Sequence, residues 1–235
     1  MASVPGIKGQ NSAHEGCHDG KDESIMKIII IGASGMIGQR LVQEGLRRKY
    51  EITAAGRDVS KFDTTNEKLH VMRVNVLDPA SVEAAVSGHD VVISAYGPQL
   101  GQEEELLEAA RCISEGVKNA GIRRLLVVGG AGSLEVEPGV RLMDTEQFPD
   151  EVRPMAQAHA DAYEIYRQSD LDWTYVSPAS WIEPGKRTGN FRIGTTRLIT
   201  DDEGASRISA EDYAAAFFDE VEEPAFVRDR FTVAY

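Results

Sequence analysis

The stretch that decides the fold is Lys27-Ile-Ile-Ile-Ile-Gly-Ala-Ser-Gly-Met-Ile-Gly38, in which an apolar run leads directly into three glycines. Four consecutive isoleucines predict a strand that is buried on both faces, as in a parallel sheet. After the glycines, Ile37, Leu41 and Leu46 recur at helical spacing, and Glu51-Ile-Thr-Ala-Ala55 predicts a second strand. The chain therefore opens with a strand, helix, strand unit.

Strands and helices continue to alternate after this unit. Further strands are predicted at residues 69–76, 90–94, 124–128 and 173–177, and helices at residues 78–86, 106–117 and 156–167. Such alternation implies a parallel sheet with right-handed crossovers. The predicted fold class is α/β, a Rossmann-like doubly wound parallel sheet in a single domain over residues 26–235.

The last part of the chain changes character and predicts a small C-terminal region on the substrate side. Residues 178–208 contain several glycines and an alternating run at residues 190–194, which predicts loops and a hairpin. Ser209-Ala-Glu-Asp212 resembles a capping box with Asp in place of Glu, and predicts the start of a last helix. Residues 231–235 predict a terminal strand.

Composition excludes several classes of function. With 25 Lys and Arg against 38 Asp and Glu, the net charge of the 235 residues is −13, which argues against a nucleic-acid surface. No run approaches the roughly 18 apolar residues that span a bilayer, and residues 1–25 lack the apolar core of a signal peptide. We therefore predict a cytoplasmic protein without a membrane or nucleic-acid partner.

Residues 1–25 are polar and rich in Gly, which predicts a disordered extension. His14, Cys17 and His18 could in principle bind a metal, but this stretch shows no hydrophobic periodicity that would place them. Cys17 and Cys112 are too few for a disulfide framework or a metal cluster. No metal site is predicted.

The glycine-rich turn predicts nucleotide binding. Gly32, Gly35 and Gly38 meet three needs, which are a tight turn, a close approach of the backbone to a pyrophosphate, and a helix start with free N–H groups. The spacing G-x-x-G-x-x-G is typical of short-chain reductases rather than of the standard G-x-G-x-x-G dehydrogenases.

The end of the second strand indicates which cofactor is preferred. An acidic residue there would bind the ribose 2′-hydroxyl of NAD(H), whereas an arginine would pair with the 2′-phosphate of NADP(H). The strand is followed by Arg57, with Asp58 one place late and Lys61 nearby. We therefore predict NADP(H), with NAD(H) as the alternative, unless Arg57 is simply an exposed loop residue.

Five stretches together carry a family resemblance. They are Gly32-Ala-Ser-Gly-Met-Ile-Gly38, Val127-Val-Gly-Gly-Ala-Gly-Ser-Leu134, Leu171-Asp-Trp-Thr-Tyr-Val-Ser-Pro178, Glu183-Pro-Gly-Lys-Arg-Thr-Gly189 and Arg207-Ile-Ser-Ala-Glu-Asp-Tyr213. On these, residues 26–235 resemble the NAD(P)H-binding atypical short-chain dehydrogenases/reductases. The most similar group is the bacterial one named for NADH-flavin reductase activity, which is related to biliverdin-IXβ/flavin reductase.

The resemblance implies a set of cofactor contacts at the carboxyl ends of the strands. The turn from Gly32 would hold the pyrophosphate, Arg57 the ribose phosphate, and residues 76–77 the adenine, with residues 95–97 beside the nicotinamide ribose. The residues implied are Gly32, Ala33, Ser34, Gly35, Met36, Ile37, Arg57, Val76, Leu77, Ala95, Tyr96 and Gly97.

The catalytic pair of classical short-chain dehydrogenases is missing. That pair is Tyr-x-x-x-Lys, in which the lysine lowers the pKa of the tyrosine for proton exchange with an alcohol or ketone. The nearest match is Tyr163-Glu-Ile-Tyr-Arg167, with Arg in the lysine position. Aligning the helix by its position before the sixth strand puts the two slots near Met155 and His159 instead. Direct hydride transfer to a planar acceptor needs no such pair.

Two residues are candidates for catalytic roles. Ser133 follows the fifth strand, where short-chain reductases place a hydroxyl donor, unless it only caps a turn. His159 could donate a proton because the unperturbed pKa of histidine is about 6.5, unless it faces solvent. Trp181 and Phe191 could stack on a planar substrate, or could belong to the core.

These observations favour an NAD(P)H-dependent oxidoreductase that transfers a hydride from NADPH to a free flavin, a quinone or a bilin. A non-catalytic redox sensor that binds NADP(H) is the rival, because the Tyr/Lys pair is missing. A sugar-nucleotide epimerase is disfavoured, since such enzymes usually need that pair and a larger C-terminal domain.

Overall fold

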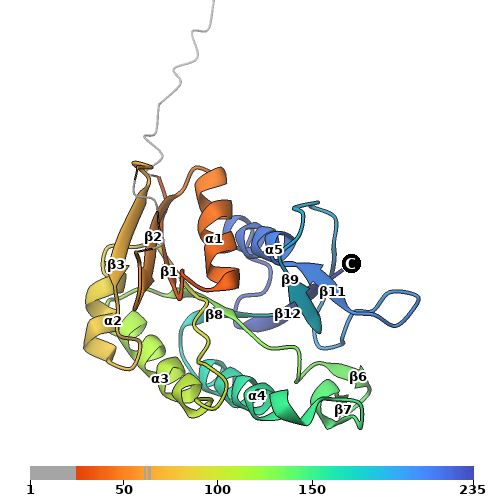
Figure 1. Cartoon of the computed structure of the whole chain (residues 1–235). Coiled ribbons are helices and arrows are strands. Elements are labelled where there is room, and N and C mark those ends of the chain that lie inside the picture. The colour runs from red at the N-terminus through yellow and green to blue at the C-terminus, as the bar shows by residue number, and fades with distance from the viewer. Residues whose placement is uncertain (1–24, 61, 63–64) are drawn as a thin grey trace, which may run out of the picture.

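The structure is a computed structural model that describes residues 25–60, 62 and 65–235 (Figure 1). An eight-stranded sheet lies at its centre, in the order β10-β12-β8-β5-β4-β1-β2-β3. The predicted extension, with His14, Cys17 and His18, falls on residues 1–24 and Lys61 is also outside the described residues. Predictions about these residues therefore stay predictions.

The central sheet is parallel except at one edge. Its strands are β1 (Lys27–Ile31), β2 (Glu51–Gly56), β3 (Leu69–Arg73), β4 (Val91–Ser94), β5 (Arg124–Val128), β8 (Asp172–Ser177), β10 (Arg192–Gly194) and β12 (Asp229–Ala234). Only β10 runs antiparallel to its neighbour, β12. The order of the first six strands reverses between β1 and β4, as a doubly wound sheet requires. The predicted Rossmann-like fold is confirmed.

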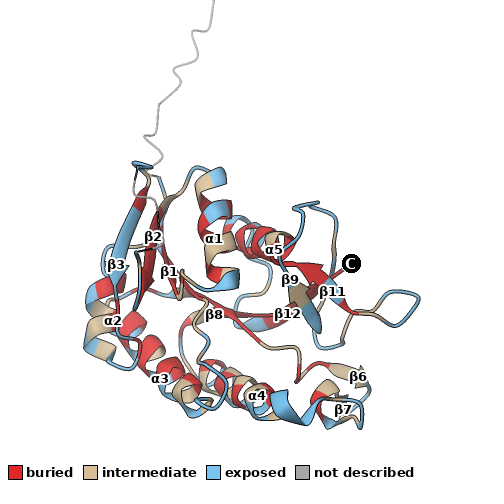
Figure 2. Ribbon diagram, in the orientation of Figure 1, coloured by how far each residue is buried: buried red, intermediate tan, exposed pale blue. Residues whose placement is uncertain are grey.

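Helices cover both faces of the sheet (Figure 1). One face carries α1 (Met36–Arg47) and α5 (Ala210–Glu222), and the other carries α2 (Pro79–Val86), α3 (Glu104–Asn119) and α4 (Arg153–Arg167). Strand β1 shows why, since Ile28 and Ile30 belong to the first core and Ile29 and Ile31 to the second. All four are completely buried, and the middle of the sheet is correspondingly buried in Figure 2.

Two helices begin at side-chain caps that the sequence predicted. Asp78 accepts a hydrogen bond from the backbone N–H of Ala80, and Pro79 occupies the first turn of α2. At α5, the Ser209 hydroxyl accepts from the N–H of Asp212 at 3.0 Å. The Asp212 carboxylate does not return to Ser209, however. It accepts from the Thr188 and Gly189 N–H groups and so anchors the loop that precedes β10.

The C-terminal region differs from the predicted hairpin. The alternating run forms β10, which pairs with the terminal strand β12 at the edge of the sheet instead of with a sequence neighbour. A separate two-stranded parallel sheet joins β9 (Trp181–Glu183) to β11 (Arg207–Ser209). A three-residue strand has too little pattern of its own to select its partner, so the pairing is decided by which edge is free.

An insertion between β5 and α4 is also visible at the edge of the molecule in Figure 1. It contains the β6 (Glu135–Glu137) and β7 (Val140–Arg141) ribbon and the short 3₁₀ helices η1 (Leu142–Asp144) and η2 (Asp150–Val152). Among the described residues, no helix is long and apolar enough to cross a membrane. The same part of the chain contains no group of three or more His, Cys, Asp or Glu side chains that could hold a metal ion.

Candidate functional site

A groove of about 240 Å³ opens at the carboxyl ends of β1, β2 and β4, and we call it the glycine groove. The lining residues are Gly32, Ser34, Gly35, Gly56, Arg57, Asp58, Val74, Val76, Ala95, Tyr96 and Gly97. The groove lies where the strand order reverses, which is the usual ligand position in open α/β sheets.

Most of the residues implied by the resemblance line this groove, but four do not. Ala33 is completely buried, and Ile37 packs against the core beneath α1. Met36 is exposed at the start of α1, and Leu77 lines a separate hollow between α3 and α4. Gly56, Asp58 and Val74 line the groove although the sequence did not single them out as cofactor contacts.

The glycines in and next to the groove are of two kinds. At some of them the fold leaves no room for a Cβ, and at others it does. A Cβ at Gly32 would lie 2.5 Å from the Ala95 carbonyl oxygen, and one at Gly38 would lie 2.2 Å from the Gly32 oxygen. Gly35, Gly56 and Gly97 have no positive φ, and an added Cβ would meet nothing nearer than 3.4 Å. Among the described glycines, only these three have neither a positive φ nor an atom nearer than 3.4 Å to an added Cβ, and all three line the groove.

The N-terminus of α1 has the features of an anion-binding site. Its cap residue, Gly35, makes no side-chain capping bond, and the first turn contains no acidic residue. Asp78 and Ser209 cap α2 and α5 with their side chains. An uncapped helix start presents free N–H groups and the positive end of the helix dipole, which together suit a pyrophosphate.

The end of β2 carries Arg57 and Asp58 into the groove, and both are exposed. The Asp58 carboxylate accepts hydrogen bonds from the Ser60 N–H at 3.0 Å and from the Ser60 hydroxyl at 2.6 Å. Asp58 thus helps to close the turn after β2. Arg57 is the positively charged side chain that lines the groove at the end of β2.

Tyr96 forms part of the groove wall and does not act as an acid near neutral pH. Its hydroxyl donates to Glu105 at 2.9 Å. Burial, with the bond to the Glu105 carboxylate, raises the pKa of Tyr96 to about 12. This contact joins the loop after β4 to the first turn of α3.

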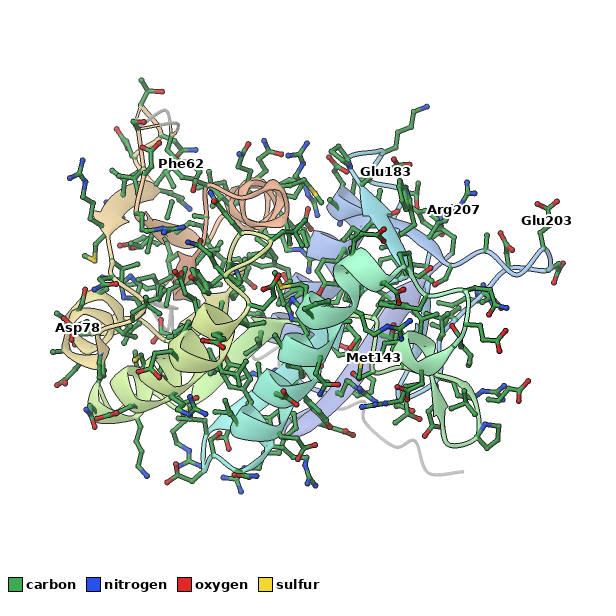
Figure 3. All side chains as sticks on the ribbon, turned by 60° about the horizontal axis from the view of Figure 1, so that its bottom comes forward. Phe62, Asp78, Met143, Glu183, Glu203 and Arg207 are labelled. Carbon is green, nitrogen blue, oxygen red and sulfur yellow. The ribbon has the colours of Figure 1, made fainter. Side chains whose placement is uncertain are left out.

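A larger cavity of about 520 Å³ lies next to the groove, and we call it the apolar pocket. The lining residues are Leu100, Gly130, Ala131, Gly132, Leu142, Thr145, Gln147, Phe148, Pro149, Val152, Met155, Ala156, His159, Ser180 and Trp181. They come from the loops after β4, β5 and β8, from the first residue of β9, from the insertion and from α4. Figure 3 labels Met143 in the insertion beside α4.

The groove and the pocket are neighbours. β4 and β5 pair side by side, so the loops that follow them, at residues 95–97 and 129–132, leave the same edge of the sheet. A small hollow between the two sites is lined by Tyr96, which also lines the groove, and by His159, which also lines the pocket.

Helix α4 presents Met155 and His159 to the apolar pocket, one turn apart. These are the positions that alignment on the sixth strand gave for the Tyr and Lys slots. Tyr163 is the other candidate, and it packs among Trp173, Tyr175 and Arg230 without lining the pocket. The arrangement thus contains no Tyr/Lys pair at the pocket.

The comparisons with known proteins agree with this geometry. Residues 32–224 match the family model described as NAD(P)H-binding. The chain belongs to this NAD(P)H-binding family. The predicted resemblance to atypical short-chain reductases is thereby confirmed.

Three solved structures illustrate the range of names within this fold. A "putative exported protein" of Burkholderia pseudomallei is 47% identical, with 90% of this chain and all of that chain covered and a TM-score of 0.82. A "putative epimerase" of Bacteroides thetaiotaomicron is 41% identical over 90% and 97% of the two chains (TM-score 0.85). A "putative NADH-flavin reductase" of Streptococcus pneumoniae is 31% identical over 89% and 99% (TM-score 0.78). The shared fold does not select one activity, and the cytoplasmic location stays a prediction.

His159 lies between α4 and the loop after β5 rather than in solvent. Gly130 packs directly on it, because a Cβ there would lie 2.9 Å from the His159 Cβ. Burial lowers the pKa of His159 to about 4. Its ring is therefore neutral at pH 7, so it can donate a hydrogen bond into the apolar pocket but holds no imidazolium proton to transfer.

Ser133 is turned toward the sheet. Its hydroxyl accepts a hydrogen bond from Arg230 of β12 at 3.0 Å, and it is not among the residues that line the apolar pocket. Arg230 is 7% exposed and also lies over the Tyr163 ring at 5.0 Å. Ser133 therefore ties the loop after β5 to the neighbouring strands.

The two aromatic candidates separate. Trp181 is 59% exposed at the mouth of the pocket, where it is free to stack on a ligand, whereas Phe191 packs against the core.

Sequence reasoning missed the wall that the insertion supplies, which includes Leu142, Phe148, Pro149 and Val152. The signal in the sequence was a set of apolar side chains in residues 142–152, a stretch that has neither helical nor strand periodicity.

Proposed function

We propose that the protein is a reductase that passes a hydride from NADPH to a planar acceptor, of which free flavin, quinone and bilin are the candidate classes. The observation that carries the proposal is an apolar pocket directly beside the glycine groove, into which α4 presents Met155 and His159 in place of a Tyr/Lys pair. A site without an acid–base pair suits an acceptor that needs only to be held against the donor.

Bound NADPH would supply the hydride. The free N–H groups at the start of α1 would hold the pyrophosphate, and Arg57 would pair with the 2′-phosphate. The walls of the apolar pocket would exclude water and orient the acceptor. The neutral His159 would donate a hydrogen bond, and solvent would supply the proton that follows the hydride. Ser133 would act through Arg230 by holding the loop that forms one wall.

The experiment is NADPH oxidation followed at 340 nm by the full chain with FMN, riboflavin and a naphthoquinone. We expect turnover with at least one acceptor and weaker activity with NADH. Saturable NADPH binding without turnover on any planar acceptor would contradict the proposal.

That second result would support the rival function, a sensor that binds NADP(H) without reacting. The missing Tyr/Lys pair favours it, because a chain that only senses the cofactor needs no proton donor. A difference in protease resistance between the NADP⁺-bound and NADPH-bound protein, in the absence of turnover, would distinguish a sensor from an inactive enzyme.

A further inference from the structure

The apolar pocket differs from the rest of the molecule in charge. Of all residues in the chain, 27% are Asp, Glu, Lys or Arg, so about four would be expected among the fifteen that line the pocket. None of the fifteen is one of these four types. The hollow between α3 and α4 shows the contrast, because Glu103, Glu104, Glu105, Glu108, Arg111 and Asp161 line it.

The one titratable side chain in the lining does not supply a charge either. Burial lowers the pKa of His159 to about 4, which leaves it neutral at physiological pH. The remaining polar side chains are Thr145, Gln147 and Ser180, and the Ser180 hydroxyl donates to the Ser206 carbonyl.

Arg153 and Arg207 lie near the pocket without lining it. Arg153 lies behind the wall, where it stacks on Phe148 at 5.5 Å and donates to the Phe148 carbonyl and to the Asp150 carboxylate. Beyond Trp181, a groove of about 570 Å³ is lined by Arg207 but also by Glu183, so its lining has no net charge (Figure 3).

The pocket mouth is apolar as well. Leu100 is 67% exposed, Trp181 59% and Val152 38%, and the three lie on different segments of the chain. A phosphate or carboxylate placed here would lose its hydration without gaining a cation, whereas an uncharged ring would bury apolar surface. The volume falls within the usual range for small-molecule sites.

We propose that the apolar pocket selects uncharged planar carbonyl compounds, so that a quinone or an unphosphorylated flavin is accepted in preference to FMN or to a bilin with its two carboxylates. This inference rests on the proposed function for the identity of the site as an acceptor site.

The test is a binding measurement that does not require turnover. Riboflavin and FMN differ only by a phosphate, and 1,4-naphthoquinone and its 2-sulfonate form a second pair. Each is titrated by calorimetry into the full chain saturated with NADP⁺. We expect the uncharged member of each pair to bind about three- to tenfold more tightly. An affinity for FMN equal to or higher than that for riboflavin would overturn the inference.

Two variants distinguish an effect of the pocket lining on ligand selectivity from an effect of the protein's overall charge. Gln147→Lys adds a cation to the lining, and Gln157→Lys adds the same charge to the far side of α4. We expect the first to improve FMN binding relative to riboflavin by about threefold and the second to leave the ratio unchanged. Equal shifts in both variants would show that the selectivity does not come from the pocket.

The two proposals fail separately. Selective binding of the uncharged compounds without NADPH oxidation would remove the reductase but retain the pocket's selectivity. Oxidation that prefers FMN would retain the reductase and remove the selectivity.

Discussion

The glycine groove and the apolar pocket lie at the same edge of the central sheet but are lined by different kinds of segment. The groove is lined by short stretches at the ends of four adjacent strands, β1 to β4, and Gly32, Ser34 and Gly35 belong to the glycine motif after β1. Twelve of the fifteen residues that line the pocket lie in the stretch 130–159, which includes the loop after β5, the insertion and part of α4, and the others are Leu100, Ser180 and Trp181. The groove thus contains a motif that the sequence alone makes recognisable, whereas the pocket is lined by loop, insertion and helix residues that share no sequence pattern.

The sharpest test of the groove is Gly35→Val. Gly35 has φ −70° and ψ 170°, which any residue can adopt, and an added Cβ would meet nothing nearer than 3.4 Å. We expect the protein to remain folded but to lose detectable NADPH binding in calorimetry, because the branched side chain would occupy the pyrophosphate position. Gly38→Val is the matched control, since its Cβ would lie 2.2 Å from the Gly32 oxygen and should destabilise the fold itself. Unchanged NADPH affinity in Gly35→Val would contradict the assignment of the groove.

The next largest effect is expected at a buried carboxylate that joins α1 to the loop after β9. Arg187, in the loop after β9, donates to the Glu44 carboxylate of α1 at 2.9 and 3.1 Å, and Arg47 and Arg48 bind the same carboxylate. Glu44 is only 4% exposed, and its bonds to these arginines outweigh the burial that would raise its pKa, so the pKa falls to about 2. Glu44→Gln should therefore lower the free energy of unfolding by about 3 kcal/mol at pH 7, measured in urea.

The pH dependence of this effect has a definite sign. Because the pKa of Glu44 is lowered on folding, its contribution is complete above the unfolded pKa of about 4.3 and is lost as the pH falls toward 2. The difference between the natural chain and Glu44→Gln should narrow over that interval. Glu51→Gln is the comparison, because it removes an ion pair with Lys27 at 3.7 Å in which the lysine side chain is 52% exposed. It should lower the free energy of unfolding by about 0.5 kcal/mol or less. An equally small effect at Glu44 would show that the buried cluster is not stabilising.

Arg57→Ala tests which cofactor the groove prefers. Loss of a charge-assisted contact with the 2′-phosphate should cost about 1.5–3 kcal/mol, or roughly 10- to 150-fold in NADPH affinity. NADH binding should change little, because NADH lacks that phosphate. Parallel titrations with both cofactors provide the measurement, and equal losses for the two, or a natural chain that already prefers NADH, would refute the preference.

The smallest effects are expected at Ser133 and His159, the two residues that the sequence suggested for catalytic roles. Ser133→Ala should lower kcat with a planar acceptor by less than tenfold, through loosening of the loop held by Arg230, and His159→Ala should lower it less. Because the pKa of His159 is about 4, kcat should also show no titration of this group between pH 6 and 8. Steady-state NADPH oxidation at saturating cofactor measures both. A loss of 10³-fold in either variant would reveal an obligatory acid or base.

The elements that the sequence predicted well are those with a local cause. Buried isoleucines in β1, the Asp78-Pro79 start of α2 and the glycine turn each contain their own explanation within a few residues. The groove residues Gly32, Ser34, Gly35 and Arg57 follow from that turn and from the strand that pairs with it. Hydrophobic period, caps and glycine turns act over one or two helical turns, so a single chain displays them directly.

Contacts between distant segments required the tertiary structure. Only the folded chain shows that β10 pairs with β12, that residues 142–152 wall the pocket and that Ser133 turns toward Arg230. It also shows that Asp212 anchors the loop at residue 188 instead of closing a capping box. Each depends on which surfaces remain free after the core has formed, because short irregular segments have no periodicity that selects a partner. The charge-free lining of the pocket has the same origin, since Leu100, the stretch 130–159 and Ser180-Trp181 become neighbours only in the folded chain.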